Sequence, residues 1–376
     1  MAIKSKLKIH KPLFSTTLNE IYPSQSFHLD ETMTVGKVIS SSLISGGPYR
    51  KRALIDFFGG GFSSFDVQNN GNFNKAILSV FTANAKSLET QTQIEVSVVS
   101  GSGNMFMPGR GRRDSVPPVN EGATFAFQNA GSAVNWSSPL GQTGSNTEAR
   151  TTVNYDIFGY NHSINDTQDL HADISTGLIT HTGNAINPLP RFVALNFRAA
   201  NENDEKRRGE VEFYSAMTQT IYQPTLYLAS ESTAACRTGK ELGDINLSED
   251  YILYHQNLKP SYRSKGIIKF RFAARAMYET PSFGTSSKDF GVGYIPSSST
   301  YNFLDTKANQ LLLPDLLTSS LAIESDTSGH YIAGVPANLF YPYRKYQLVV
   351  NVKAGDDSSG ILDDMFVLPE TFQIEG

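Results

Sequence analysis

The sequence contains little cysteine, little charge and no long apolar run. Its 376 residues include a single cysteine, Cys236, so an intramolecular disulfide cannot form, which is typical of a protein that folds in a reducing cytoplasm. No window is apolar over the length that crosses a bilayer. The N-terminus carries Lys4, Lys6, Lys8 and Lys11, but no apolar stretch follows them. We therefore expect a soluble protein with no secretory signal and no membrane partner.

An excess of basic residues is missing as well. Charged residues make up 18% of the chain, the formal net charge is −4 and the isoelectric point is about 6.0. Nucleic-acid binders usually carry a basic excess because phosphate neutralisation supplies most of their affinity. The charge balance therefore predicts no nucleic-acid partner. A low charge content also suits large assemblies, whose surfaces are covered by neighbouring subunits.

Helical periodicity is scarce, whereas alternation with a period of two is frequent. This alternation predicts β-strands, and the turn-forming segments 59–61 and 69–72 separate the early ones. A short helix is expected over residues 311–317, where Pro314 limits its length. The expected strands are 35–39, 52–57, 75–81, 93–99, 151–157, 191–197, 210–214, 226–228, 266–275, 301–304, 321–323, 330–333, 346–352, 365–368 and 371–374.

Strands in succession without intervening helices predict an all-β fold of two tandem antiparallel β-sandwiches. We expect the first to be jelly-roll-like and the second to be immunoglobulin-like or fibronectin-like. The predicted organisation is an extended N-terminal arm (1–30), a β-sandwich (31–231) with a long loop excursion near 101–150, a linker (232–247) and an immunoglobulin-like sandwich (248–376).

The arm is expected to be disordered or ordered on a neighbouring subunit, because its short apolar pieces cannot bury much of themselves. Segment 198–215 predicts a hairpin. The acidic residues at its tip, Glu202 among them, would be neutralised by Lys206, Arg207 and Arg208.

Four residues of the long excursion are candidates for an interface or a ligand contact: Arg110, Arg112, Arg113 and Trp136. The arginines could bind phosphates or acidic glycans through bidentate guanidinium contacts, or pair with an acidic patch on a neighbouring subunit. Trp136 could stack on a sugar ring, or it could close the end of a hydrophobic core.

Other constellations do not match a known chemistry. His162, Asp166, Asp169, His171 and Asp173 lie close together, but their spacing matches no recognised metal motif. The triplet 59–61 lacks the lysine of a phosphate-binding loop, Cys236 has no conspicuous partner, and no Gly-x-Ser-x-Gly segment occurs. We therefore predict no catalytic residue, no cofactor, no metal site and no enzymatic activity.

Several segments, taken in order, resemble a family of tail-associated virion structural proteins of large contractile-tailed bacteriophages, especially marine and cyanobacterial ones. In the first half they are RALIDF (52–57), LSVFTANA (78–85), IEVSVVSGS (94–102), the Gly-Arg-Gly-Arg-like run 109–114, Trp136 and GEVEFYSAMTQTIYQPTLYL (209–228). In the second half they are IIKFRF (267–272), YIPSSSTY (294–301), SDTSG (325–329) and YPYRKYQLVV (341–350). Members of that family often carry more tryptophans in the loop region, whereas this chain has only Trp136.

The resemblance implies a non-enzymatic virion component with no catalytic residue to carry over. Such a protein would be assembled in the host cytoplasm and would act in the tail, baseplate, neck or fibre-attachment region. Its partners would be other virion structural proteins and copies of itself in a homo-oligomer. The alternative is a phage adhesin that binds a host-surface receptor or glycan through Trp136 and the arginines. A depolymerase would need a paired-carboxylate cleft, which the loop aspartates do not obviously supply.

Overall fold

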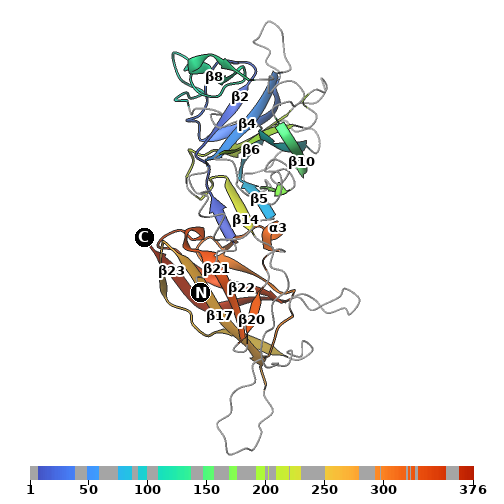
Figure 1. Ribbon diagram of the computed structural model, residues 1–376, viewed down its shortest axis with the longest axis vertical. Helices are drawn as coiled ribbons and strands as arrows, with labels where there is room; N and C mark the ends of the chain where they lie inside the picture. The colour runs from blue at the N-terminus through green and yellow to red at the C-terminus, as the bar shows by residue number, and fades with distance from the viewer. Residues whose placement is uncertain are drawn as a thin grey trace, which may run out of the picture. The chain divides into compact units, whose positions relative to one another are not determined.

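The computed structural model describes two compact units, formed by residues 10–227 and by residues 1–9 with 228–376. We call them the N-terminal and the C-terminal unit (Figure 1). The described residues are 7–38, 49–58, 75–86, 92–99, 109–136, 147–155, 169–175, 192–199, 202, 209–219, 221–229, 250–278, 293–296, 298–318, 321, 323–326, 329–352 and 364–376. The predicted linker (232–247), Cys236 and the glycines at 59–61 lie outside them.

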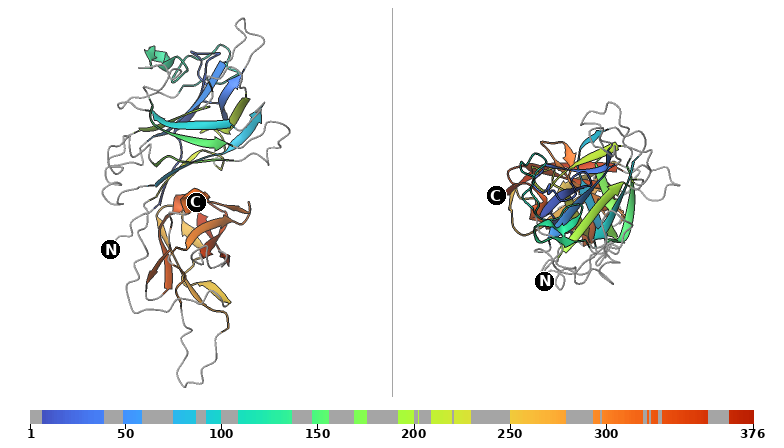
Figure 2. Two further views of the ribbon diagram at one scale, coloured as in Figure 1. Left: turned by 90° about the vertical axis from the view of Figure 1, so that its right-hand side faces the viewer. Right: turned by 90° about the horizontal axis from the view of Figure 1, so that it is seen from above.

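The predicted all-β class is confirmed: strands dominate both units in every view (Figures 1 and 2). The helix expected over 311–317 is reduced to α3 (Asp315–Thr318), which begins directly after Pro314. No helix in the described ranges has the length and apolarity needed to cross a bilayer.

Most of the strands from β1 to β14 form two main sheets. A four-stranded sheet has the order β1-β14-β5-β11, and an eight-stranded sheet has the order β10-β7-β12-β4-β3-β13-β6, with β2 also paired to β4. Their bounds are β1 (Leu7–His10), β2 (Phe14–Asn19), β3 (Thr32–Val38), β4 (Tyr49–Phe58), β5 (Lys75–Val80), β6 (Thr82–Lys86), β7 (Thr92–Val99), β10 (Thr147–Tyr155), β11 (Leu170–Asp173), β12 (Phe192–Ala199), β13 (Gly209–Tyr214) and β14 (Thr225–Ala229). A separate small pair joins β8 (Phe127–Asn129) to β9 (Val134–Asn135).

A single residue, Phe81, separates β5 from β6, although the two strands belong to different sheets. The expected strand 75–81 is therefore longer than predicted and passes from one sheet into the other at this residue. Strands that switch sheets at such a bend form the corners of orthogonally packed β structures.

The expectation of an extended arm over residues 1–30 needs correction for its described part. Strand β2 pairs antiparallel with β4 from Phe14 to Asn19, and every one of its residues is buried. Phe14 and Leu18 belong to a core cluster of their own chain. The polar composition of this segment concealed the strand, because only two of its six side chains are large and apolar.

The hairpin expected over residues 198–215 is also absent. Strand β12 pairs with β4 and β7, whereas β13 pairs with β3 and β6. The two strands are consecutive along the described chain, yet β4 and β3 lie between them in the sheet. Sequence adjacency suggested direct pairing, but the long-range ladders are formed instead.

The C-terminal unit has the topology of an immunoglobulin-like sandwich, as predicted. One sheet has the order β15-β17-β21-β20 and the other β16-β23-β22-β18-β19. These orders match the A-B-E-D and G-F-C arrangements of that fold. The β16–β23 ladder is parallel. The strands are β15 (Tyr251–His255), β16 (Ser261–Arg263), β17 (Ile267–Ala276), β18 (Thr300–Asp305), β19 (Gln310–Leu311), β20 (Glu324–Asp326), β21 (Gly329–Pro336), β22 (Lys345–Val352) and β23 (Asp364–Glu375).

Tyr346 makes a contact that is characteristic of this topology. It lies near the start of β22, and its hydroxyl accepts a hydrogen bond from the Tyr341 amide at 2.8 Å. The same hydroxyl lies 3.3 Å from the Tyr341 carbonyl oxygen, to which it donates. A tyrosine that bonds back to the backbone a few residues upstream, at the start of the F strand, is the tyrosine corner of immunoglobulin-like domains.

Aromatic rings fill the centre of this sandwich. Phe303 on β18 lies 5.3 Å from Phe270 and 4.9 Å from Phe340, measured between ring centroids. Phe372 on β23 lies 5.0 Å from Phe270 and 5.1 Å from Phe340. Tilted and edge-on pairs at these distances are favourable beyond the area that they bury. The four rings therefore join both sheets of the sandwich.

Candidate functional site

The arginine loop, defined as residues 109–119, is fixed to residues 25–30 by backbone bonds. The Ser26 amide donates to the Val119 carbonyl at 2.9 Å, and the Leu29 amide donates to the Gly111 carbonyl at 3.0 Å. The Gln25 side-chain amide adds a bond of 3.2 Å to the Arg112 carbonyl. This part of the long excursion is therefore held by its own chain.

The alternation of glycine and arginine has a steric cause. A Cβ atom on Gly109 would lie 2.2 Å from the Ser26 hydroxyl oxygen, and one on Gly111 would lie 2.2 Å from the Ser26 carbonyl oxygen. Both positions therefore require glycine, and both are buried. Arg110 and Arg112 are exposed, and among the described residues neither forms an ion pair. The loop consequently presents two cationic side chains from a close-packed backbone.

Arg113 anchors the loop. Its backbone amide donates to Asp30 Oδ1 at 2.9 Å, and its guanidinium lies 3.9 Å from Glu212 Oε1 on β13. Burial raises the pKa of Asp30, although the bond from the Arg113 amide and the charge of Arg113 act in the opposite direction. Of the three predicted arginines, two are therefore presented outward and one also contacts its own chain.

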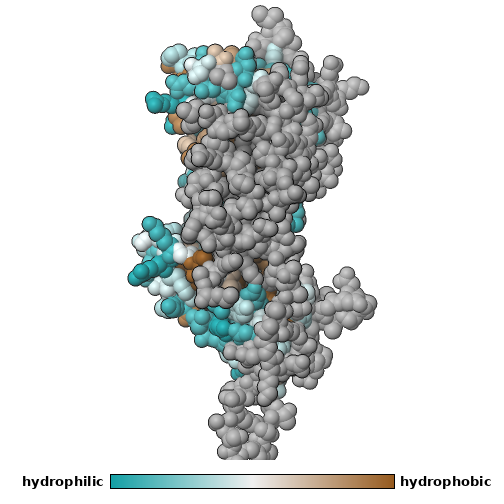
Figure 3. All heavy atoms as spheres, viewed as in Figure 1, coloured by the Kyte–Doolittle hydropathy of each residue, from teal (hydrophilic) through white to brown (hydrophobic). Residues whose placement is uncertain are grey.

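Beyond the arginines, the loop exposes apolar surface at Val116, which is 94% exposed and precedes the exposed Pro117 and Pro118. Hydrophilic residues cover much of the visible described surface around β8, at the top of the N-terminal unit (Figure 3). The loop therefore combines an exposed apolar side chain with two exposed guanidinium groups, and arginine is enriched in protein interfaces.

Trp136 occupies the core, which confirms that it closes a hydrophobic core and rules out the alternative of an exposed ligand contact. The side chain is only 6% exposed and packs in one cluster with Phe14, Leu18 and Leu54. Its indole Nε1 donates to the Thr124 carbonyl at 3.0 Å. A buried tryptophan with a satisfied N–H is a packing residue, and no ring face is available for a sugar.

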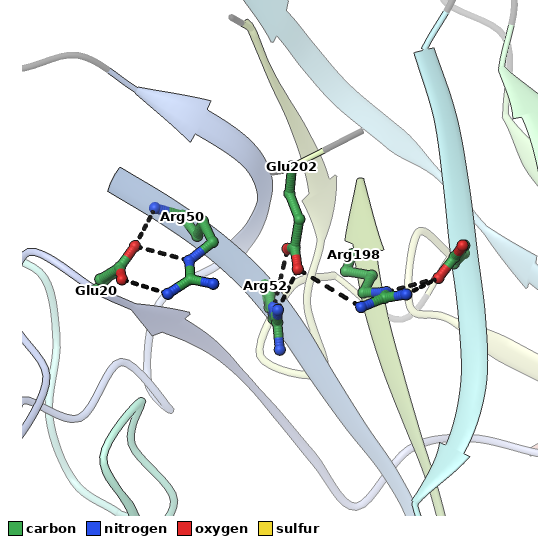
Figure 4. Close-up of polar contacts among 6 residues, drawn as sticks. Glu20, Arg50, Arg52, Arg198 and Glu202 are labelled. Carbon is green, nitrogen blue, oxygen red and sulfur yellow. Dashed lines mark hydrogen bonds and ion pairs between the residues drawn. The ribbon is translucent and has the colours of Figure 1, made fainter. Parts of the chain in front are cut away.

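An ion pair between β4 and residue 20 also contacts the long excursion near 101–150. Arg50 on β4 donates from Nε to Glu20 Oε2 at 3.0 Å and from Nη2 to Glu20 Oε1 at 2.6 Å (Figure 4). The Arg50 guanidinium carbon also lies 5.8 Å from the centre of the Phe125 ring. This bidentate pair lowers the pKa of Glu20 against the opposing effect of its burial.

A second charge network was missed by the sequence reasoning. Arg52 and Glu202 pair with side chains that are each 2% exposed, and Glu202 Oε1 also lies 3.7 Å from Arg198 (Figure 4). Arg198 in turn donates from Nε to Glu95 Oε2 at 2.6 Å. The predicted neutralisation of Glu202 by residues 206–208 is therefore wrong for Glu202. Those basic residues lie outside the described residues.

Two further titratable groups are buried beside β2. Asp56 on β4 faces Phe14 across the ladder, and its Oδ1 has no hydrogen-bond partner. The His28 ring centroid lies 5.6 Å from that of Phe14. His28 Nδ1 shares a hydrogen bond of 2.8 Å with the Ser26 hydroxyl, and His28 Nε2 has no hydrogen-bond partner. Burial raises the pKa of Asp56 to about 7 and lowers that of His28 to about 4.

The residues considered as metal ligands have other partners where they are described. His171 lies 3.0 Å from the Ser79 hydroxyl, Asp169 accepts the Thr82 amide at 3.0 Å, and Asp173 accepts Lys75 Nζ at 2.6 Å. Within the described residues, no group of three or more potential ligands is close enough to hold an ion. His162 and Asp166 lie outside the described ranges.

Comparison with known proteins identifies no relative: no protein-family model matches the chain, and no curated protein matches it. Among solved structures, a β-1,2-glucanase from Parabacteroides distasonis aligns over all of this chain at 9% identity and a TM-score of 0.18. The chain spans 38% of that enzyme's length. The adhesin domain of Epf from Streptococcus pyogenes aligns over 98% of both chains at 6% identity and a TM-score of 0.15. TM-scores this low carry no argument about fold or function.

Proposed function

We propose that this protein is a non-enzymatic structural component of a bacteriophage virion that assembles through its arginine loop. It would act as a connector in the tail, baseplate, neck or fibre-attachment region. The ordered resemblance to tail-associated virion proteins motivates this role. The observation that carries the assembly mechanism is the close-packed backbone of the loop, from which Arg110 and Arg112 extend without an ion pair in the described residues.

Preorganisation is the physical basis of the proposal. Binding costs free energy when a loop must be ordered, and a loop already held by backbone bonds avoids most of that cost. The bonds from Ser26 and Leu29 provide this restraint. Because β2 is buried in its own sheet, we assign the connector function to the arginine loop and not to an N-terminal arm. The partner is a virion protein, or a second copy, with an acidic surface.

The adhesin alternative loses its aromatic contact, because Trp136 is buried. It would now depend on arginines 110 and 112 alone. Binding of the purified protein to host cells would favour it, provided that Arg110→Glu/Arg112→Glu abolishes the binding.

The test is incorporation of variants into particles, measured by quantitative blotting of purified virions from a complementation assay. Arg110→Glu/Arg112→Glu should reduce incorporation at least tenfold. Arg110→Lys/Arg112→Lys keeps the charge but removes the bidentate geometry, and it should retain an intermediate level. Trp136 fluorescence should be unchanged in both, which excludes misfolding. Wild-type incorporation of the charge-reversed protein would refute the role of the loop.

A further inference from the structure

Tyr343, at the turn before β22, combines backbone strain with exposure. Its φ is +62°, a left-handed conformation that is uncommon for a bulky residue, and the side chain is 78% exposed. The strain therefore does not serve the burial of this ring. Residues in sparsely populated conformations persist when their surroundings hold them, and they gather at functional positions.

A backbone hydrogen bond holds the main chain at Tyr343. Its amide donates to the Ile374 carbonyl on β23 at 2.9 Å. The ring lies beside Gly376, where an added Cβ atom would approach the Tyr343 hydroxyl to 2.8 Å. An exposed tyrosine ring is suited to serve as an anchor in a protein interface, because tyrosine offers a large contact area at a low cost in side-chain entropy.

Exposed cations surround this tyrosine on both sides of β23. Lys345 pairs with Gln373 in the β22–β23 ladder, and Arg263 pairs with Glu375 in the parallel β16–β23 ladder. Since neighbouring strands lie about 4.8 Å apart, Lys345 and Arg263 lie on either side of the strand that binds the Tyr343 backbone.

Two more lysines are brought to the same end by backbone bonds. The Gln373 amide donates to the Pro260 carbonyl at 3.0 Å, which places Lys259 beside β23. The Thr306 hydroxyl and amide both donate to the Lys345 carbonyl, at 3.0 and 3.1 Å, which places Lys307 next to Lys345. All four cations are exposed, and in the described part of the chain none has an ion-pair partner.

The acids described beside this group are Asp305 and Glu375. Asp305 is buried and paired with Arg344 at 3.0 Å, so both of those charges are already compensated. Glu375 accepts a hydrogen bond from the Ser261 hydroxyl at 2.6 Å and is the exposed acid next to Arg263. The described residues of this end of the C-terminal unit therefore carry a local positive charge, in a chain whose net charge is −4.

We propose that the Tyr343 surface, defined as Tyr343, Lys259, Arg263, Lys307 and Lys345, docks an acidic segment of a partner protein. The four cations attract carboxylates, and an apolar side chain of the segment packs on the Tyr343 ring. A protein fits better than single-stranded nucleic acid, which is bound by successive stacking rings, because this surface offers one exposed ring. The proposal concerns a different unit from the arginine loop and does not depend on it.

The test uses the full-length protein and a fluorescent 12-residue peptide of alternating glutamate and tyrosine, with anisotropy as the readout. A peptide of alternating lysine and tyrosine and a 12-nucleotide oligothymidylate serve as probes for comparison. We expect saturable binding of the acidic peptide alone, weakening as salt rises from 50 to 300 mM. Arg263→Glu/Lys345→Glu should weaken it about tenfold or more, a loss within the range of interface hot spots.

Two variants separate binding from folding and from general electrostatics. Tyr343→Gly suits the positive φ, so it should leave the melting temperature unchanged or raised while weakening peptide binding about tenfold. Arg110→Glu/Arg112→Glu reverses as much charge on the other unit and should leave peptide affinity within twofold of wild type. Equal losses in both charge-reversed proteins, a melting temperature lowered by Tyr343→Gly, or tighter binding of oligothymidylate than of the peptide would each overturn the proposal.

Discussion

Replacing Glu202 by alanine should strongly destabilise the N-terminal unit. Glu202 neutralises Arg52, and both side chains are 2% exposed. Burial already lowers the pKa of Arg52, against the effect of Glu202. Arg198 keeps Glu95 as a partner in the variant, whereas Arg52 loses the buried carboxylate with which it pairs. Removal of one partner of a buried ion pair costs about 3–5 kcal/mol.

Trp136 makes the measurement selective. It is the only tryptophan of the chain and lies in the core of the N-terminal unit, so its fluorescence reports the unfolding of that unit in the full-length protein. In urea titrations we expect the midpoint of the Trp136 transition to fall by about 1–2 M, given a typical slope of about 3 kcal/mol per M. The transition of the C-terminal unit, resolved by circular dichroism beside the Trp136 transition, should keep its midpoint.

A matched control is available in the neighbouring pair. Glu20→Gln breaks a bidentate pair with Arg50 whose side chains are about one quarter exposed, and such pairs contribute about 0–1 kcal/mol. The double substitution Arg52→Met/Glu202→Leu should recover most of the stability lost in Glu202→Ala, because both charges of the buried pair are then replaced by apolar side chains. If Glu202→Ala costs no more than Glu20→Gln, the assignment of Arg52 as a buried, dependent cation is refuted.

Three further predictions use the same probes. Because the folded-state pKa of Asp56 is raised to about 7, its protonated form stabilises the fold at low pH. Relative to Asp56→Asn, the wild-type N-terminal unit should lose up to about 4 kcal/mol as pH rises from 4 to 8, while His28, whose pKa burial lowers to about 4, changes stability in the opposite direction in both proteins. Identical pH profiles of the Trp136 midpoint in the two proteins would contradict this. Deletion of residues 1–30 removes β2 with Phe14 and should abolish the cooperative Trp136 transition; a truncated protein that melts normally would restore the idea of an independent arm. Phe303→Ala should destabilise the C-terminal unit by about 3–5 kcal/mol in circular dichroism without moving the Trp136 midpoint, and a shift of that midpoint would show that the units do not unfold independently.

The strands that could be predicted from the sequence are those with clean alternation. Strands β7 and β17 show a period of two, and their ladders occur where the pattern places them. Strand β2 could not be found in this way, because Ser15, Thr16 and Thr17 are buried by pairing rather than by apolarity.

Long-range partners limited the prediction of the candidate site. The chemistry of Arg110 and Arg112 follows from their residue type, whereas the close packing of Gly109 and Gly111 became visible only in the structure. The burial of Trp136 depends on Phe14, more than a hundred residues away in the sequence, and Glu202 is 150 residues from Arg52. No local pattern encodes such pairs, since they form only when the sheet assembles.

The passage of one strand through both the four-stranded and the eight-stranded sheet has a mechanical consequence. Strands β5 and β6 are joined by Phe81 alone, whose carbonyl accepts the Tyr214 amide at 2.9 Å. Tension applied to either sheet therefore reaches the other through covalent backbone, without first extending a loop. A shear that separates the two sheets must therefore break the hydrogen bonds of the β5 ladder or those of the β6 ladder, so the two sheets share the load.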